Sequence, residues 1–198
     1  MDELPLLMAL RVQGISTPER AGAASGSDPE AAATALTGLA ERELCTERGG
    51  RGFTLTPAGA QAVEKLLAEE GLRGNVVLTE CYERFLGLNK RILKVSSDWQ
   101  LRRDGGVEVG NDHSDPHYDD EVVERLGQIH ERARICLDAM CASGARFRPY
   151  LERLDACVER LRAGDRSAFT APLAESYHTV WFELHQDLLL TLGLKREE

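Results

Sequence analysis

The first 70 residues contain two closely spaced helix starts, then a glycine turn and a third helix start. This order constrains the fold of the segment more than any other feature. Residues 16–19 (STPE) and 27–30 (SDPE) each place a capping side chain before a proline and a glutamate. This order is typical of a helix N-terminus, because the cap accepts free backbone N–H groups and proline suits the first turn. The helix after residue 28 has one apolar face, formed by Ala32, Ala35, Leu36, Leu39 and Ala40. Two short helices joined by a tight turn at Gly26 predict a helix-turn-helix.

A β-hairpin is predicted directly after this pair of helices. Residues 44–48 and 51–56 read as two short strands on either side of Gly49-Gly50, a strong hairpin signal. A further helix begins at Pro57 and continues through Glu70. We therefore predict a winged helix-turn-helix domain with a small β-hairpin wing over residues 1–70.

The order of these parts, together with residues 55–59 (LTPAG), resembles the MarR-type winged-helix family. In that family the last wing strand runs into a Leu-Thr-Pro-x-Gly helix start. The resemblance implies a dimeric, DNA-binding transcriptional regulator whose second helix enters the major groove while the wing approaches the phosphates or the minor groove. The DNA-binding residues predicted on this basis are Arg20, Thr34, Thr37, Arg42, Arg48 and Arg51.

A second domain, an antiparallel helical bundle, is predicted over residues 76–198 after a linker at 71–75. Its helices are expected at about 76–103, 118–141, 147–162 and 172–192, with a polar loop over 104–116. The chain as a whole is thus predicted to be mainly α. Residues 97–100 (SDWQ) and 177–188 (YHTVWFELHQDL) resemble a helical domain that follows a MarR-like winged helix in some actinobacterial proteins, including some related to pyruvate phosphate dikinase. The phosphohistidine motif of such dikinases is absent, so no phosphotransfer activity is implied.

Large rings and histidines gather on the bundle-facing stripes of these helices. Ligand sites in bundles combine apolar walls with a few convergent polar groups, and buried Trp and Tyr need partners for their polar hydrogens. The sequence therefore predicts a small-molecule pocket; the alternative is an ordinary aromatic core whose histidines are satisfied within the fold. The predicted ligand-binding residues are Asn89, Trp99, His130, Tyr177, His178, Trp181 and His185.

No metal or other cofactor is predicted. The segment 111–120 (NDHSDPHYDD) is rich in possible ligands, but its acidic residues are interpreted as turn and helix caps, with a metal site as the alternative. There is no GxSxG, glycine-rich phosphate loop or HExxH motif, so no enzymatic activity is predicted. The five cysteines lack a CxxC pair and are interpreted as buried, reduced thiols.

Charge weighs against strong DNA binding. The net charge is −9, and residues 1–70 contain six Lys and Arg against eleven Asp and Glu, a net of −5. The groove-facing segment 28–37 has no Arg, Lys, Asn or Gln, the side chains that make bidentate contacts with bases. The winged helix could instead be a protein-interaction or dimerisation module. No apolar run approaches the ~18 residues of a membrane span, and the N-terminus lacks a signal-peptide pattern. We therefore expect a cytoplasmic protein with no membrane partner.

These observations favour a ligand-responsive, MarR-like transcriptional regulator that binds DNA through the winged helix and an unknown small-molecule effector in the bundle, as a homodimer. The alternative is an accessory or interaction protein that does not bind DNA and serves a phosphotransferase or biosynthetic partner. An enzyme that uses the His, Asp and Trp side chains of the bundle is a third, weaker hypothesis.

Overall fold

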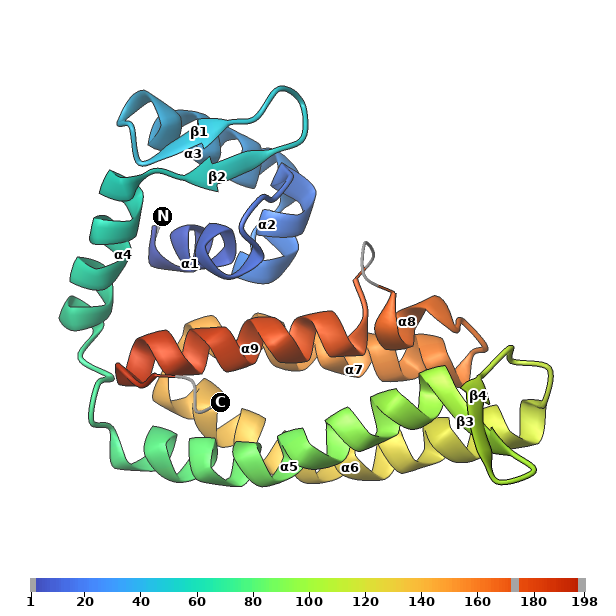
Figure 1. Cartoon of the computed structure of the whole chain (residues 1–198). Coiled ribbons are helices and arrows are strands. Elements are labelled where there is room, and N and C mark those ends of the chain that lie inside the picture. Colours follow the sequence, from blue (N-terminus) through green and yellow to red (C-terminus); the bar gives the residue numbers. More distant parts are fainter. Residues whose placement is uncertain (1–2, 172–174, 196–198) are drawn as a thin grey trace.

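The computed structural model describes residues 3–171 and 175–195, and this part of the chain is mainly helical, as predicted. A winged helix lies against one side of an antiparallel helical bundle (Figure 1). No described helix is long and apolar enough to cross a membrane. Every cysteine is free and buried, which confirms the interpretation of these residues as structural thiols.

The winged helix contains each element that the sequence predicts. Thr17 and Asp28 cap the two helices of the helix-turn-helix, and Gly26 ends the first in a left-handed conformation. Ser16 adds a contact that was not predicted, because its backbone exchanges two hydrogen bonds with Phe53 (2.8 and 2.9 Å) and extends the wing sheet. The elements are α1 (Leu4–Gln13), α2 (Pro18–Ser25), α3 (Pro29–Glu41), β1 (Cys45–Glu47), β2 (Phe53–Leu55) and α4 (Pro57–Glu70).

The structure gives a physical reason for the LTPAG segment. The Thr56 hydroxyl accepts a hydrogen bond from Gly59 N–H (3.1 Å) and donates one to the Glu43 carbonyl (2.6 Å), so it both caps α4 and ties it to the wing. The first turn of α4 lies so close to the wing that a Cβ atom at position 59 would sit 1.9 Å from the Leu44 carbonyl oxygen. Only glycine fits there.

Four long helices form the bundle, and each contacts the next in a closed ring. Their facing sides build one core that includes Phe85, Leu126, Leu154 and Leu184. The predicted helix start at Pro172 lies outside the described residues. The bundle elements are α5 (Val76–Gln100), α6 (Pro116–Ser143), a 3₁₀ turn (Ala145–Phe147), α7 (Arg148–Arg162), the short α8 (Ser167–Thr170) and α9 (Tyr177–Leu192).

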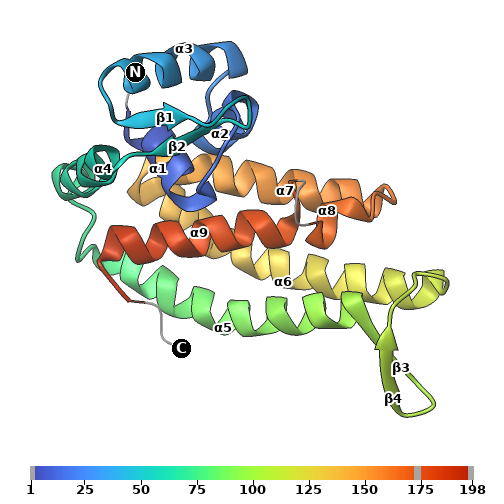
Figure 2. The same cartoon turned by 45° about the horizontal axis from the view of Figure 1, so that its top comes forward.

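A second hairpin replaces part of the helix and the loop predicted between the first two bundle helices. Strands β3 (Leu101–Asp104) and β4 (Val107–Gly110) pair antiparallel across a Gly105-Gly106 turn. The prediction of helix to residue 103 and loop to 116 was therefore wrong. A glycine pair between two short segments of alternating apolar and polar residues indicates a β-hairpin, as in the wing. This second hairpin ends α5 at Gln100. The hairpin projects from the end of the bundle (Figure 2).

The two domains share a packed boundary. Helix α1 contacts α9, α2 contacts α7, and Leu190 of α9 packs into the winged-helix core. At this boundary the buried Arg146 guanidinium joins both domains. It donates to both carboxylate oxygens of Glu70, at the end of α4, and to both of Asp187 in α9. The winged helix is thereby held to the bundle by an ion pair as well as by apolar contact.

Candidate functional site

Helix α3 and the wing form the first candidate surface. Both lie on the side of the winged helix that faces away from the bundle (Figures 1 and 2). Thr34 and Thr37 are exposed on α3, and Arg48 and Arg51 are exposed at the wing tip. The two arginines flank Gly49-Gly50, where both glycines have positive φ and turn the chain. The predicted DNA-binding residues are therefore accessible to a macromolecule.

The electrostatics of this surface are mixed. Asp28 accepts hydrogen bonds from the backbone N–H groups of Glu30 (2.9 Å) and Ala31 (3.4 Å), so its carboxylate is fixed at the N-terminus of α3. Glu30 and Glu41 are exposed on the same helix. Arg42, a predicted DNA contact, forms an ion pair with Glu3, which neutralises part of its charge. The positive charge available to a phosphate is thus concentrated in the wing.

Five of the seven predicted ligand-binding residues, Asn89, His130, Tyr177, Trp181 and His185, lie in one cluster of side chains in the bundle. Asn89 accepts a hydrogen bond from Trp181 Nε1 (3.0 Å), and the Trp181 ring stacks on Phe85 at a centroid distance of 4.3 Å. His185 also contacts Phe85, with a ring centroid distance of 5.1 Å. Tyr177 stacks on Trp181 at 6.1 Å, one helical turn away.

His130 continues the cluster towards the surface. Burial lowers the pKa of His130 more than the neighbouring Asp155 raises it, which favours the neutral imidazole at neutral pH. Its Nε2–H then donates to Asp155 (2.8 Å), and its Nδ1 accepts from the Tyr177 hydroxyl (3.2 Å). Arg134 completes the network through an ion pair with Asp155 (3.1 Å). Each polar group of this network therefore has a partner within the fold.

Two of the predicted ligand residues lie apart from this cluster. Trp99 packs at the far end of α5 between the rings of His113 and Phe169, at centroid distances of 4.6 and 4.8 Å. His178 is half-buried on α9, where desolvation lowers its pKa. The sequence thus found the ring cluster, but these side chains pack on one another, as the alternative interpretation expected.

The polar segment 111–120 forms a loop and helix start beside Trp99 that are held by side-chain hydrogen bonds. His113 adopts a positive φ of 59°, and its Nδ1 lies 3.0 Å from both carboxylate oxygens of the buried Asp119. Asn111 donates to the same carboxylate (2.9 Å), and Asp115 caps α6 as expected. The described residues contain no cluster of three or more His, Cys, Asp or Glu side chains able to hold a metal ion. These hydrogen bonds join the end of the β3–β4 hairpin to α6 of the bundle.

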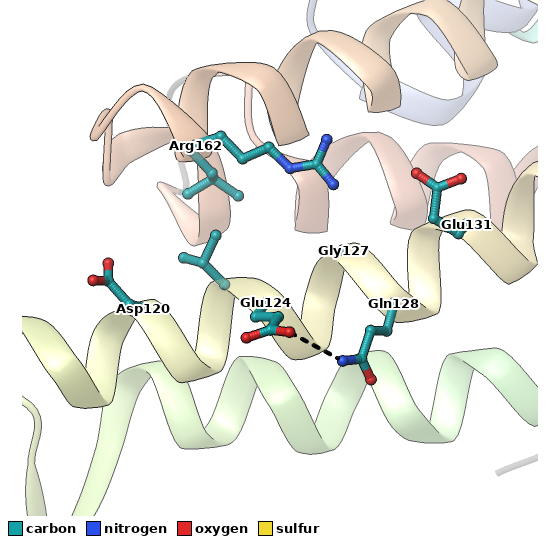
Figure 3. A pocket seen from close by; sticks show the side chains of 8 residues that line it. Asp120, Glu124, Gly127, Gln128, Glu131 and Arg162 are labelled. Carbon is teal, nitrogen blue, oxygen red and sulfur yellow. Dashed lines mark hydrogen bonds between the residues drawn. The ribbon is translucent and has the colours of Figure 1, made fainter.

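A pocket with a volume of about 450 Å³ lies between α6 and α7. Its lining includes the carboxylates of Asp120, Glu124 and Glu131, which lie across from the Arg162 side chain (Figure 3). Gln128 donates to Glu124 at 3.5 Å along the same face of α6. A smaller pocket of about 290 Å³ is lined by Trp99, Asp119 and Arg166, among others.

The neighbouring face of α6, beyond Gln128, is basic. Two adjoining pockets of about 370 Å³ each lie between α5 and α6 and share Arg91 and Arg132. Together they form one groove, which we call the basic groove. Sequence reasoning missed it, although Arg84 and Arg91, and likewise Arg125 and Arg132, are seven residues apart and so repeat on one helical face. Its lining residues are Arg84, Gly87, Leu88, Lys90, Arg91, Lys94, Val95, Arg125, Gln128, Ile129, Arg132, Ile135 and Cys136.

Comparison of the chain with protein-family models, with curated proteins and with solved structures gave no match.

Proposed function

We propose that this protein is a MarR-like transcriptional regulator that binds duplex DNA through α3 and the wing. The observation that carries the proposal is the position of these elements, which face away from the bundle and are open to a duplex. Arg48 and Arg51 would contact phosphates, with Arg20 and Arg42 adding backbone contacts, while Thr34 and Thr37 would face the major groove.

The proposal includes a homodimer. A single winged helix offers few cations, and α3 itself has carboxylates and no Lys or Arg. Two copies double the number of phosphates neutralised, and affinity depends steeply on that number. Sedimentation equilibrium of the full chain would test this part, with a dimer expected at micromolar concentration and a monomer contradicting it.

The DNA-binding proposal is tested by fluorescence anisotropy with a labelled duplex over a range of salt concentrations. Replacing both Arg48 and Arg51 by alanine should weaken binding to every sequence and flatten the salt slope by up to about 2 per monomer, because two counterion-releasing contacts are lost. The matched control is Arg103→Ala with Arg162→Ala, which removes two exposed arginines of the bundle. Equal losses in both double variants would remove the wing from the mechanism.

A second candidate function is an interaction module that serves a phosphotransferase or biosynthetic partner without binding DNA. The carboxylates of α3 favour it, since phosphates repel them at the position where base contacts are made. Replacing Asp28 by asparagine and Glu30 by glutamine distinguishes the two, and asparagine keeps the cap. Tighter DNA binding by this variant would support a DNA-facing α3, whereas unchanged affinity would favour the interaction module.

The proposed effector is a small molecule bound by the bundle. The pocket beside Trp99, at about 290 Å³, is close to the lower size of known small-molecule sites, roughly 300 Å³. Arg166 lines this pocket and pairs with Asp119 (3.4 Å), so an anionic ligand would compete with that carboxylate for the guanidinium. Native mass spectrometry of the purified protein should detect a bound organic molecule that a Trp99→Ala variant releases. A bound molecule that this variant retains would contradict the assignment to this pocket.

A further inference from the structure

The basic groove concentrates positive charge on a protein with a net charge of −9. Among the described residues that line it there are six cations and no carboxylate. Asp98 lies at one end and pairs with Lys94 (2.5 Å) and Arg125 (2.8 Å). The other four, Arg84, Lys90, Arg91 and Arg132, form no ion pair within the described part of the chain. Their charge is available to a partner.

The groove lining also includes apolar side chains. Ile135 is 66% exposed although it is a large hydrophobic residue, and it lines the same pocket as Arg84, Arg91 and Arg132. Leu88 is half-buried in this lining, whereas Val95 and Ile129 are buried and expose little surface. A groove that combines apolar side chains with cations is complementary to a partner whose apolar face is flanked by anions.

The dimensions suit a helix. The lining runs from Arg84 to Val95 on α5 and from Arg125 to Cys136 on α6, which at 1.5 Å per residue is about 16 Å, or three turns. An amphipathic helix that lays its apolar face in a groove of this length is a recurrent mode of peptide recognition.

Charge decides among the possible occupants. In a symmetric dimer formed through this face, Arg91 and Arg132 of one copy would face the same arginines of the other, which is repulsive. A nucleic-acid backbone would use the cations but would leave Ile135 without an apolar partner. We propose that the groove binds an acidic amphipathic helix of a partner protein. Because α5 and α6 form the layer of the bundle farther from the winged helix (Figure 1), the site does not depend on the proposed DNA-binding function.

The experiment uses the full ¹⁵N-labelled chain and a 16-residue synthetic peptide with leucines on one helical face and glutamates on the others. Amide shifts on titration should cluster at residues 84–95 and 125–136. Replacing Arg91 and Arg132 by glutamate should raise the dissociation constant at least tenfold. The matched control Arg11→Glu with Arg103→Glu, which changes the net charge equally at exposed positions outside the groove, should leave it within twofold. If the glutamate variant is poorly folded, Arg91→Gln with Arg132→Gln should still give at least a threefold loss.

Two further arms separate the apolar and charged contributions. Ile135→Ser should weaken binding at least threefold, and a peptide of identical composition with scrambled order should bind at least fivefold more weakly. Equal binding of the ordered and scrambled peptides, or shifts spread outside the groove, would overturn the proposal. So would a duplex oligonucleotide that shifts the groove amides when the peptide does not, since the occupant would then be nucleic acid.

Discussion

Replacing Arg146 by methionine removes a buried cation that joins the two domains. The Asp187 carboxylate, 2% exposed, then loses two charge-assisted hydrogen bonds at 2.5 and 2.7 Å and keeps those from the Tyr150 and Thr191 hydroxyls. Glu70 loses its two bonds at the end of α4. Removing one partner of a buried ion pair costs about 3–5 kcal/mol, a large part of a typical unfolding free energy of about 5–15 kcal/mol.

The assay is urea denaturation followed by tryptophan fluorescence and by far-ultraviolet circular dichroism. Trp99 and Trp181 both lie in the bundle, so fluorescence reports that domain while dichroism reports every helix. Arg146→Met together with Asp187→Leu should recover most of the loss, because a buried pair replaced by apolar groups is often neutral. Arg42→Met, which breaks the exposed pair with Glu3, should leave the unfolding free energy nearly unchanged, because solvent screens exposed ion pairs. A loss of unfolding free energy below about 1 kcal/mol for Arg146→Met, or a double variant no more stable than the single one, would contradict a stabilising role of the buried Arg146–Asp187 pair.

Three further predictions test the packing of the fold. Gly59→Ala should destabilise the winged helix by about 1–3 kcal/mol or more, since its Cβ would overlap the Leu44 carbonyl oxygen. The control is Gly87→Ala in α5, whose Cβ would meet no atom within 4 Å. It should stabilise the chain by up to about 1 kcal/mol in the same denaturation assay, because alanine favours the helix over glycine. Burial lowers the pKa of His178, so the unfolded chain binds more protons below about pH 6.5 and stability falls as the pH drops through that range. His178→Gln should flatten this slope in urea titrations at pH 5 to 7, and an unchanged slope would contradict the role of its burial. Burial raises the pKa of every cysteine thiol, to about 11 for Cys157. A thiol reagent at pH 7.5 should therefore label the cysteines only after unfolding. Labelling of the folded chain would contradict this burial.

Local signals in the sequence were sufficient for most of the fold. The caps at Thr17 and Asp28 and the wing at Gly49-Gly50 act within a few residues, so their outcome does not depend on distant packing. The β3–β4 hairpin carried an equally local signal at Gly105-Gly106 and was missed, because the apolar stripe of α5 was extended past Gln100. Periodicity alone does not show where a helix stops.

The candidate site was less predictable, because it depends on which side chains meet. The sequence identified Trp181, Tyr177 and His130 as a group, and helical spacing explains why two of them lie on one face of α9. It could not show that Asn89 and Asp155 satisfy these rings from other helices, since such pairings exist only in three dimensions. The cations of the basic groove were visible at their seven-residue spacing, but their meeting across α5 and α6 required the antiparallel register of the bundle.

The most direct test of the proposed function is amide hydrogen exchange of the full chain with and without a saturating duplex. DNA should slow exchange in α3 (residues 29–41) and in the wing at 47–53, with little change in α5 and α6. Protection confined to the bundle, or no protection at any duplex concentration, would contradict the assignment of DNA binding to the winged helix.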